Sequence, residues 1–197
     1  MLTGVVFCGG KSSRMGSDKG LLQKGLTTWA ELAFQKLQCL GLKVVISINE
    51  TQKETYSRVF TEELLVVDRP SSVFNCEGPL RGLLSVHQQL PESELFVLAC
   101  DMTDISIAVL YKLKNIYRLN QFTHDNFTYI NQGESEPMCA IYSWQKLHEI
   151  NRSALDHQLV RFSLKYILSK GKTLIVKAEI SESASFFNYN EKLTLHH

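Results

Sequence analysis

The N-terminal segment joins a short apolar run to a glycine-rich loop. The run Leu2–Phe7 is apolar and β-branched, which is typical of a buried strand. Gly9 and Gly10 follow, and without a Cβ the backbone there can turn so that main-chain N–H groups converge on an anion. Arg14 adds a fork of donors and Lys19 a mobile cation, both suited to phosphate oxygens. The segment therefore predicts a buried strand that ends in a polyphosphate-binding loop.

The spacing of this loop excludes two common phosphate-binding motifs. A Walker A loop needs G-x-x-x-x-G-K-[ST], but Gly16 is followed by serine, and the dinucleotide fingerprint G-x-G-x-x-G is also absent. The segment from Gly9 to Lys19 instead reads G-G-x-S-x-R-M-G-x-D-K without a gap.

Composition limits the kind of protein this is. A chain of 197 residues is expected to form one domain, residues 1–197, of which His196 and His197 resemble the start of an expression tag. A net charge of +1 without a basic block argues against a nucleic-acid partner, and no apolar run approaches the length of a membrane span. The five scattered cysteines argue against a disulfide framework and a zinc motif, and they suit a reducing cytoplasm.

Apolar runs and helical stretches alternate along the chain. Further strands are expected at 43–48, 64–67, 94–99, 126–131, 138–142 and 173–177. Helices are expected at 29–40 after a Thr27 or Thr28 cap, from a capping box at 51–54, at 78–90, at 106–119, and from 153 or 156 to 169. Because the strands read as continuous apolar runs, we expect an α/β fold with a mostly parallel sheet covered on both faces. The strands on either side of Gln132–Gly133 are expected to pair antiparallel.

Polar side chains follow several of these strands. In an open parallel sheet, ligands bind outside the carboxyl ends of the strands. The residues expected at that edge, besides the glycine loop, are Ser47, Asn49, Asp68, Asp101 and Asn188. Asp101 follows an apolar strand directly, and Mg²⁺ commonly takes one or two carboxylates plus substrate phosphates. The sequence therefore predicts a Mg²⁺ ligand at Asp101.

Four segments, in order along the chain, resemble those of the molybdenum cofactor guanylyltransferases (MobA-type), within the nucleotidyltransferase superfamily. They are the Gly9–Lys19 loop, Gly78–Gly82 (G-P-L-x-G), Cys100–Met102 (C-D-M) and Phe187–Asn190 (F-N-Y-N), which resembles the family's closing F-x-N-x-N segment with its two Asn positions at Asn188 and Asn190. Glu136–Pro137, followed by an apolar strand, resembles the segment that leads toward the cofactor pocket in that family. The resemblance implies a Rossmann-like three-layer α/β/α sandwich with a mostly parallel sheet and an antiparallel strand or hairpin.

The resemblance also implies roles for individual residues. Arg14, Lys19 and Asp101 are expected to be catalytic, with Asp101 also holding the metal. The expected nucleotide-binding residues are Phe7, Cys8, Gly9, Gly10, Lys19, Ser47, Asn49, Asp68, Gly78 and Asp101. The residues expected to bind the acceptor are Asn188, Asn190 and Pro137. The sequence departs from the family's Leu-Ala-Gly at Phe7–Cys8, and Ser47 stands where the family often has Asn.

The implied reaction is transfer of GMP from GTP to molybdopterin with release of pyrophosphate, assisted by Mg²⁺. The expected partners are these small molecules, together with a GTP-binding accessory protein of the same pathway, and the chain is expected to be a monomer or a weak homo-oligomer. Two alternatives stay open. One is another nucleotidyltransferase of the same fold, of the molybdopterin cytidylyltransferase, sugar-phosphate or methylerythritol-phosphate type. The other is a nucleotide-binding accessory protein that has lost catalysis.

Overall fold

A seven-stranded sheet forms the centre of the computed structural model, which describes residues 1–9, 18–74, 76–187 and 189. The strand order is β5-β4-β1-β6-β8-β7-β9. The strands are β1 (Leu2–Phe7), β4 (Lys43–Ile48), β5 (Leu65–Val67), β6 (Glu94–Ala99), β7 (Asn126–Asn131), β8 (Glu134–Tyr142) and β9 (Thr173–Lys177). Two short strands, β2 (Gln23–Lys24) and β3 (Thr27–Thr28), form a separate antiparallel pair.

Six of the seven strands run in one direction. β1 pairs in parallel with β4 and β6, β4 with β5, and β7 with β9. β8 is antiparallel to both of its neighbours, β6 and β7. The predicted mostly parallel sheet with an antiparallel strand is therefore confirmed.

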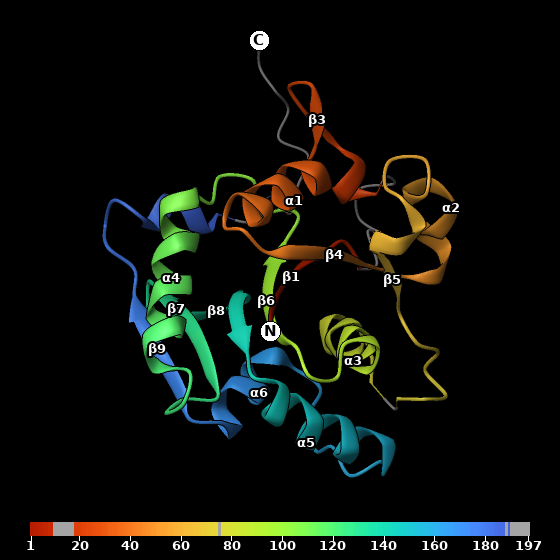
Figure 1. Ribbon diagram of the computed structural model, residues 1–197, viewed down its shortest axis with the longest axis vertical. Helices are drawn as coiled ribbons and strands as arrows, with labels where there is room; N and C mark the ends of the chain where they lie inside the picture. Colours follow the sequence, from red (N-terminus) through yellow and green to blue (C-terminus); the bar gives the residue numbers. More distant parts are fainter. Residues whose placement is uncertain (10–17, 75, 188, 190–197) are drawn as a thin grey trace.

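Helices cover both faces of this sheet (Figure 1). α1 (Trp29–Cys39) and α4 (Ile107–Asn120) lie on one face, and α3 (Pro79–Gln89), α5 (Trp144–Leu155) and α6 (Leu164–Lys170) lie on the other. Successive side chains of β1 separate the two cores: Val6 packs with α1 and α4, whereas Val5 and Phe7 pack with α3, α5 and α6. The result is the three-layer α/β/α sandwich that the sequence predicts.

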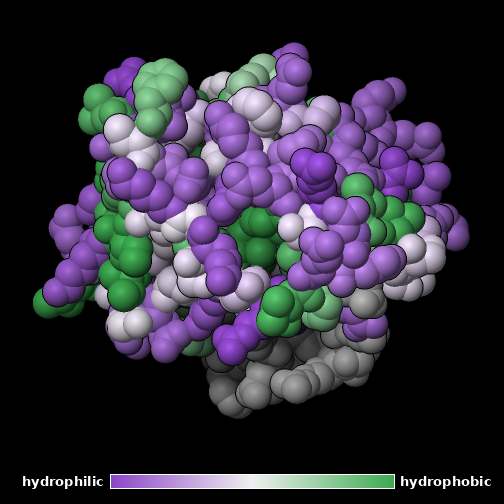
Figure 2. Space-filling model, turned by 90° about the horizontal axis from the view of Figure 1, so that it is seen from below, coloured by the Kyte–Doolittle hydropathy of each residue, from purple (hydrophilic) through white to green (hydrophobic). Residues whose placement is uncertain are grey.

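Short helical segments complete the described part of the chain. They are α2 (Lys53–Tyr56) and the 3₁₀ turns η1 (Lys19–Leu21), η2 (Glu50–Gln52), η3 (Glu62–Leu64) and η4 (Ser183–Phe186). No helix among the described residues is both long and apolar enough to cross a membrane. The face seen from below in Figure 2 is largely hydrophilic, with hydrophobic side chains in small separate groups.

Several predicted helix and turn boundaries are confirmed, and capping hydrogen bonds or positive φ angles account for them. The Thr28 hydroxyl accepts from Glu31 N at 3.2 Å and caps α1, which ends before Gly41 at φ +72°. Ser106 caps α4 through a 3.2 Å bond from Val109 N. Gln132 and Gly133, with φ of +51° and +88°, form the tight turn between β7 and β8.

Two predicted helix starts are wrong. Thr51 does not cap a helix, because the chain first forms the 3₁₀ turn η2, and Asn49 is the capping residue of that turn. The Asn49 N–H donates to the Gln52 side-chain oxygen at 2.8 Å. The single helix predicted from 153 or 156 to 169 is two helices, α5 and α6, and Asp156 ends α5 instead of starting a helix. The apolar spacing of Leu147 and Ile150, which face the core, was the missed signal for α5.

Candidate functional site

The pairing register makes four parallel strands, β1, β4, β5 and β6, end at the same edge of the sheet. Phe7 in β1 lies opposite Ser47 in β4 and Ala99 in β6. Ile48 in β4 lies opposite Val67 in β5. The residues that follow these strands, Gly9, Asn49, Asp68 and Asp101, therefore share one edge of the sheet, which we call the strand-end rim.

Lys19 and Asp101 meet on this rim. The Lys19 Nζ atom lies 3.4 Å from Asp101 Oδ2, and their side chains are 21% and 18% exposed. Asp101 follows β6, whereas Lys19 returns from the loop after β1 and begins η1. The structure thus brings together the cation and the carboxylate that the sequence assigns to phosphate and metal. Such a half-sheltered pair is more strongly attractive than the same pair in open water.

Asp18, which the site prediction missed, fixes the position of the neighbouring lysine. Its carboxylate accepts hydrogen bonds from Gly20 N at 3.0 Å, from the Tyr56 hydroxyl at 2.9 Å and from Gln52 Nε2 at 2.5 Å. Burial, followed by the neighbouring Cys8 thiol, raises the pKa of Tyr56, so the phenol stays protonated and donates. A Cβ at Gly20 would lie 2.0 Å from the Tyr56 oxygen, so only glycine fits there. Asp18 is part of the loop motif, and its place as a fixed letter was the available signal.

The main-chain donors of Cys8 and Gly9 are engaged within the sheet. Both N–H groups donate to the Ser47 carbonyl, at 3.0 and 3.2 Å. A nucleotide that binds these two N–H groups must compete with the Ser47 carbonyl, whereas the sequence suggested that the loop amides were unoccupied.

The side chains of Phe7 and Cys8 point to opposite faces of the sheet, because Cys8 packs on the α1 side and Phe7 on the α3 side. Of this pair, only Phe7 adjoins the first turn of α3.

Two glycines bring α3 close to the rim. Gly78 has φ +66° and ψ −150°, a region open almost only to glycine, and it lets α3 start at Pro79. A Cβ on Gly82 would lie 2.6 Å from a Phe7 ring carbon and 2.8 Å from the Ser47 hydroxyl oxygen. The G-P-L-x-G segment thus seats the first turn of α3 on the ends of β1 and β4.

Asp68 lies on the rim beside the first turn of α3. The Ser47 hydroxyl, on a side chain that is fully buried, donates to Asp68 Oδ1 at 3.4 Å. Burial raises the pKa of Asp68 to about 6, while the Arg81 guanidinium and the Ser47 hydroxyl act in the opposite direction. Asn49 has a local role as well, because its side-chain oxygen accepts from the Thr51 hydroxyl at 2.6 Å. Asp68 and Ser47 therefore form one partly dehydrated polar group beside the rim.

Pro137 reaches the same end of the sheet from the other side of β6. Leu98 in β6 lies opposite Cys139 in antiparallel β8, so the first half of β8 continues past the end of β6 toward Asp101. The Pro137 carbonyl accepts from the Tyr142 hydroxyl at 2.8 Å. The other residues predicted to bind phosphate or acceptor, Gly10, Arg14, Asn188 and Asn190, lie outside the described residues.

A second ion pair borders the rim next to Asp101. Lys24, from β2, lies 2.5 Å from Asp104 Oδ1, and the Tyr189 hydroxyl bonds the other oxygen of Asp104. The Tyr189 N–H donates to the Asp101 carbonyl at 3.4 Å. These contacts place Tyr189 against the loop that carries Asp101.

The donor set suits a Mg²⁺ that arrives with a nucleotide. Within the described residues there is no group of three or more His, Cys, Asp or Glu side chains that could hold a metal. Asp101 offers one partly exposed carboxylate on the rim, and Mg²⁺ in nucleotide sites commonly takes one or two carboxylates with phosphate oxygens supplying the rest. Asp101 therefore fits as the protein ligand of a shared metal and not as part of a closed metal cage.

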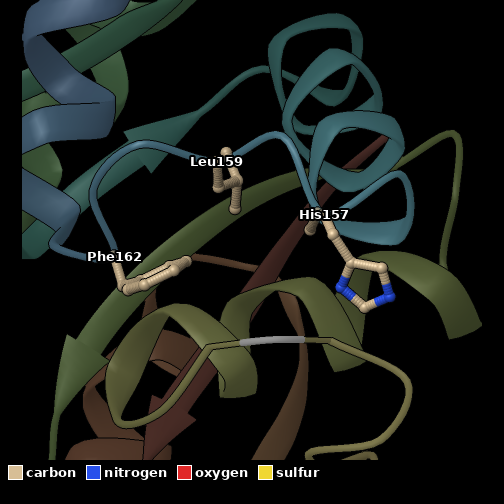
Figure 3. Close-up of a pocket in the computed structure, with 4 residues that line it drawn as sticks. His157, Leu159 and Phe162 are labelled. Atoms are coloured by element: carbon tan, nitrogen blue, oxygen red, sulfur yellow. The ribbon is translucent and has the colours of Figure 1, made fainter.

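A hollow at the α5–α6 connection is a different feature. Its cavity volume is about 10 Å³, about enough for one water molecule, and it is lined by Ala154, His157, Leu159 and Phe162 (Figure 3). Pockets for ligands of nucleotide size run to roughly 300 Å³ or more. None of the strand-end residues lines this hollow, so it does not compete with the rim as the nucleotide site.

Replacing Gly82 with alanine tests the close approach of α3. An alanine normally favours a helix over glycine by about 1 kcal/mol, but here its methyl group would overlap Phe7 and Ser47. We expect a net loss of about 1–3 kcal/mol in unfolding free energy, measured by urea titration. Gln89→Ala, at the exposed end of the same helix, should change it by less than about 0.5 kcal/mol. An equal or greater stability of Gly82→Ala would contradict the packing.

The raised pKa of Asp68 predicts a pH-dependent stability. Folding favours the protonated carboxyl, so the ionised form destabilises the native state. The loss of stability is complete above about pH 6 and absent below the ordinary pKa of 3.8. Asp68→Asn should therefore gain stability relative to the parent as pH rises from 4 to 7, by up to about 3 kcal/mol. Asp104→Asn should show the opposite trend at lower pH, because hydrogen bonds from Lys24 and then Tyr189 lower the pKa of Asp104 below its ordinary value of 3.8, so that the stability this carboxylate contributes is lost only as the pH falls below about 4. Thermal unfolding from below pH 4 up to pH 7 measures both, and a flat difference for Asp68→Asn between pH 4 and 7 would contradict the burial of its charge.

Comparisons with known proteins place the chain in a family. A family model, the MobA-like NTP transferase domain, matches residues 4–170. Proteins named "Probable molybdenum cofactor guanylyltransferase" from Flavobacterium johnsoniae and Clostridium perfringens are 26% and 27% identical; the alignments cover 96% and 94% of this chain and 92% and 90% of those proteins. A "Molybdenum cofactor biosynthesis bifunctional protein" from Synechocystis is 29% identical over 72% of this chain, which spans only 39% of that longer protein.

Solved structures share the fold. Molybdopterin-guanine dinucleotide biosynthesis protein A from Archaeoglobus fulgidus superposes with a TM-score of 0.70 at 19% identity, covering 97% of this chain and 93% of that one. A 4-diphosphocytidyl-2C-methyl-D-erythritol synthase from Anaerococcus prevotii gives 0.69 at 9% identity, covering 98% and 93%. The fold alone therefore does not separate guanylyl from cytidylyl transfer. The family match, which extends from β1 to the end of α6, shows that this chain belongs to the MobA-like NTP transferase family.

Proposed function

We propose that this protein is a molybdenum cofactor guanylyltransferase, which transfers GMP from GTP to molybdopterin and releases pyrophosphate. The observation that carries the proposal is the meeting of Lys19 and Asp101 on the strand-end rim, 3.4 Å apart. Family membership and the names of the guanylyltransferase relatives support the nucleotide and the acceptor. The five free thiols support a reducing, cytoplasmic setting for this reaction.

The chemistry needs positioning and charge neutralisation more than proton transfer. A phosphate oxygen of molybdopterin attacks the α-phosphorus of GTP in line with the departing pyrophosphate, so two anions must be brought together. Lys19 binds the oxygens on which negative charge builds as pyrophosphate leaves, and Arg14 is assigned to the same charge. Asp101 would hold Mg²⁺, and the bound ion would supply neutralisation of phosphate charge. Asp18 keeps the backbone beside Lys19 in place through its three hydrogen bonds.

The two substrates are assigned to opposite sides of this pair. The base and ribose belong on the α3 side, where Phe7, Ser47, Asp68 and Gly78 lie, with Asn49 and the Cys8–Gly9 backbone next to them. The acceptor belongs on the β8 side, where Pro137 lies, together with Asn188 and Asn190. In this proposal both reacting groups lie over the ends of β1 and β6.

A cytidylyltransferase on the same fold is the second candidate. The Anaerococcus prevotii structure supports it at the level of the fold, and the departures at Phe7–Cys8 and Ser47 fall on the side assigned to the base. Nucleotide preference separates the two candidates.

Pyrophosphate release tests the proposed reaction directly. With molybdopterin and Mg²⁺, GTP should support release and CTP should not, because the base site is assigned to guanine. Omitting molybdopterin or chelating the divalent ion should stop release. Faster turnover with CTP would contradict the guanylyl assignment, and no turnover with either nucleotide would favour the accessory-protein alternative.

Asp101→Ala tests the metal ligand. We expect GTP-dependent pyrophosphate release to fall by about a hundredfold or more, because the phosphates lose both the metal and its anchor, while the thermal midpoint stays near that of the parent. Asp104→Ala is the matched control, because it removes a carboxylate from the same loop that is paired with Lys24 at 2.5 Å. It should keep most of the activity. If Asp101→Ala kept as much activity as an active Asp104→Ala variant, Asp101 would have no role in the mechanism.

A further inference from the structure

Arg81 is placed where a bound base would lie, yet neither motif nor family resemblance gives it a role. It is the variable letter of G-P-L-x-G and the third residue of α3. Its neighbour Gly82 sits against Phe7, Ser47 and Asp68, because a Cβ there would come within 2.6, 2.8 and 3.3 Å of them. The first turn of α3, which carries Arg81, therefore lies against the rim.

The guanidinium is only partly satisfied in the structure. The Arg81 Nε atom is buried and has no hydrogen-bond partner among the residues that the structure describes. The positive charge of Arg81 lowers the pKa of both Asp68 and Cys76, so the guanidinium lies near the half-buried Asp68 carboxylate and the buried Cys76 thiol. A buried donor without a partner is unfavourable, so a hydrogen-bond acceptor that reaches the guanidinium with a ligand would be stabilising.

The chemistry of the guanidinium favours one class of base. Its planar fork donates two parallel hydrogen bonds, and guanine presents two adjacent acceptors, O6 and N7, on one edge. Adenine offers N7 beside an amino donor, and cytosine presents an amino donor at N4. A guanidinium facing that edge therefore attracts guanine and repels the other two bases.

We propose that Arg81 is the residue that selects guanine, by donating to O6 and N7 of the bound nucleotide from the first turn of α3. This inference rests on the proposed guanylyltransferase function and adds the group that reads the base. The competing explanation for the same contacts is that Arg81 only offsets the charge of Asp68. In that case its removal would weaken all nucleotides equally.

Calorimetric binding with Mg²⁺ and three nucleotides distinguishes these roles. GTP is compared with 7-deaza-GTP, which lacks only the N7 acceptor, and with ITP, which lacks only the amino group on the opposite edge. The variants are Arg81→Ala and Arg81→Gln, and the control is Arg69→Ala, which removes the same charge from an exposed residue next to Asp68. Thermal unfolding of each variant confirms that it is folded.

The parent and Arg69→Ala should bind 7-deaza-GTP about tenfold more weakly than GTP. Both Arg81 variants should bind the two nucleotides equally while keeping the parental ratio of GTP to ITP. If the parent prefers GTP to CTP but the Arg81 variants retain the discrimination against 7-deaza-GTP, the role of Arg81 is wrong and the proposed function stands. If the parent binds CTP more tightly than GTP, the proposed function fails, and the guanine-selecting role fails with it.

Discussion

The parallel register of β1 with β4 and β6 is the constraint on which the site depends. Phe7 is opposite Ser47 on one side and Ala99 on the other, so residues far apart in the chain end on one rim. A slip of one residue in either pair would turn the neighbouring side chains to the other face and separate Lys19 from Asp101. The register is itself held by burial, since β1 packs into separate cores on its two faces.

Close approach of backbones is the second requirement, and glycine supplies it on both sides of β1. Gly20 lets the returning loop pass Tyr56, and Gly82 lets α3 settle on Phe7 and Ser47. The first contact keeps Asp18 with its hydrogen bonds beside the rim, and the second brings the first turn of α3, which carries Arg81, against it. The loop side can then hold phosphate and the helix side can hold a base, with the β1 backbone between them.

Much of this could be predicted from sequence, because strong local signals coincide with tertiary ones. The strands at 43–48, 94–99 and 173–177 read as short apolar runs, and they begin and end where the structure has them. The rim followed from the rule that ligands bind at the carboxyl ends of parallel strands. Lys19 and Asp101 were singled out because each belongs to a recognisable motif, Gly9–Lys19 and Cys100–Met102.

The misses have physical causes. α5 was missed because its apolar face is narrow and begins directly after β8, and a serine and an aspartate further on looked like later caps. The Cys8 and Gly9 amides were assigned to an anion because no local pattern shows that the Ser47 carbonyl takes both. Asp18, Gln52 and Tyr56 come together only through the fold, and the position of Arg81 depends on how tightly Gly82 lets its helix approach.

The central claim is that one crevice on the rim holds the triphosphate between Lys19 and Asp101. A crystal structure with Mg²⁺ and a GTP analogue carrying a methylene bridge between the α- and β-phosphorus tests it most directly. The account predicts a metal bound to the Asp101 carboxylate and to phosphate oxygens, with Lys19 against the same phosphates and the guanine beside α3. A nucleotide bound elsewhere, or a triphosphate that contacts neither Lys19 nor Asp101, would contradict it.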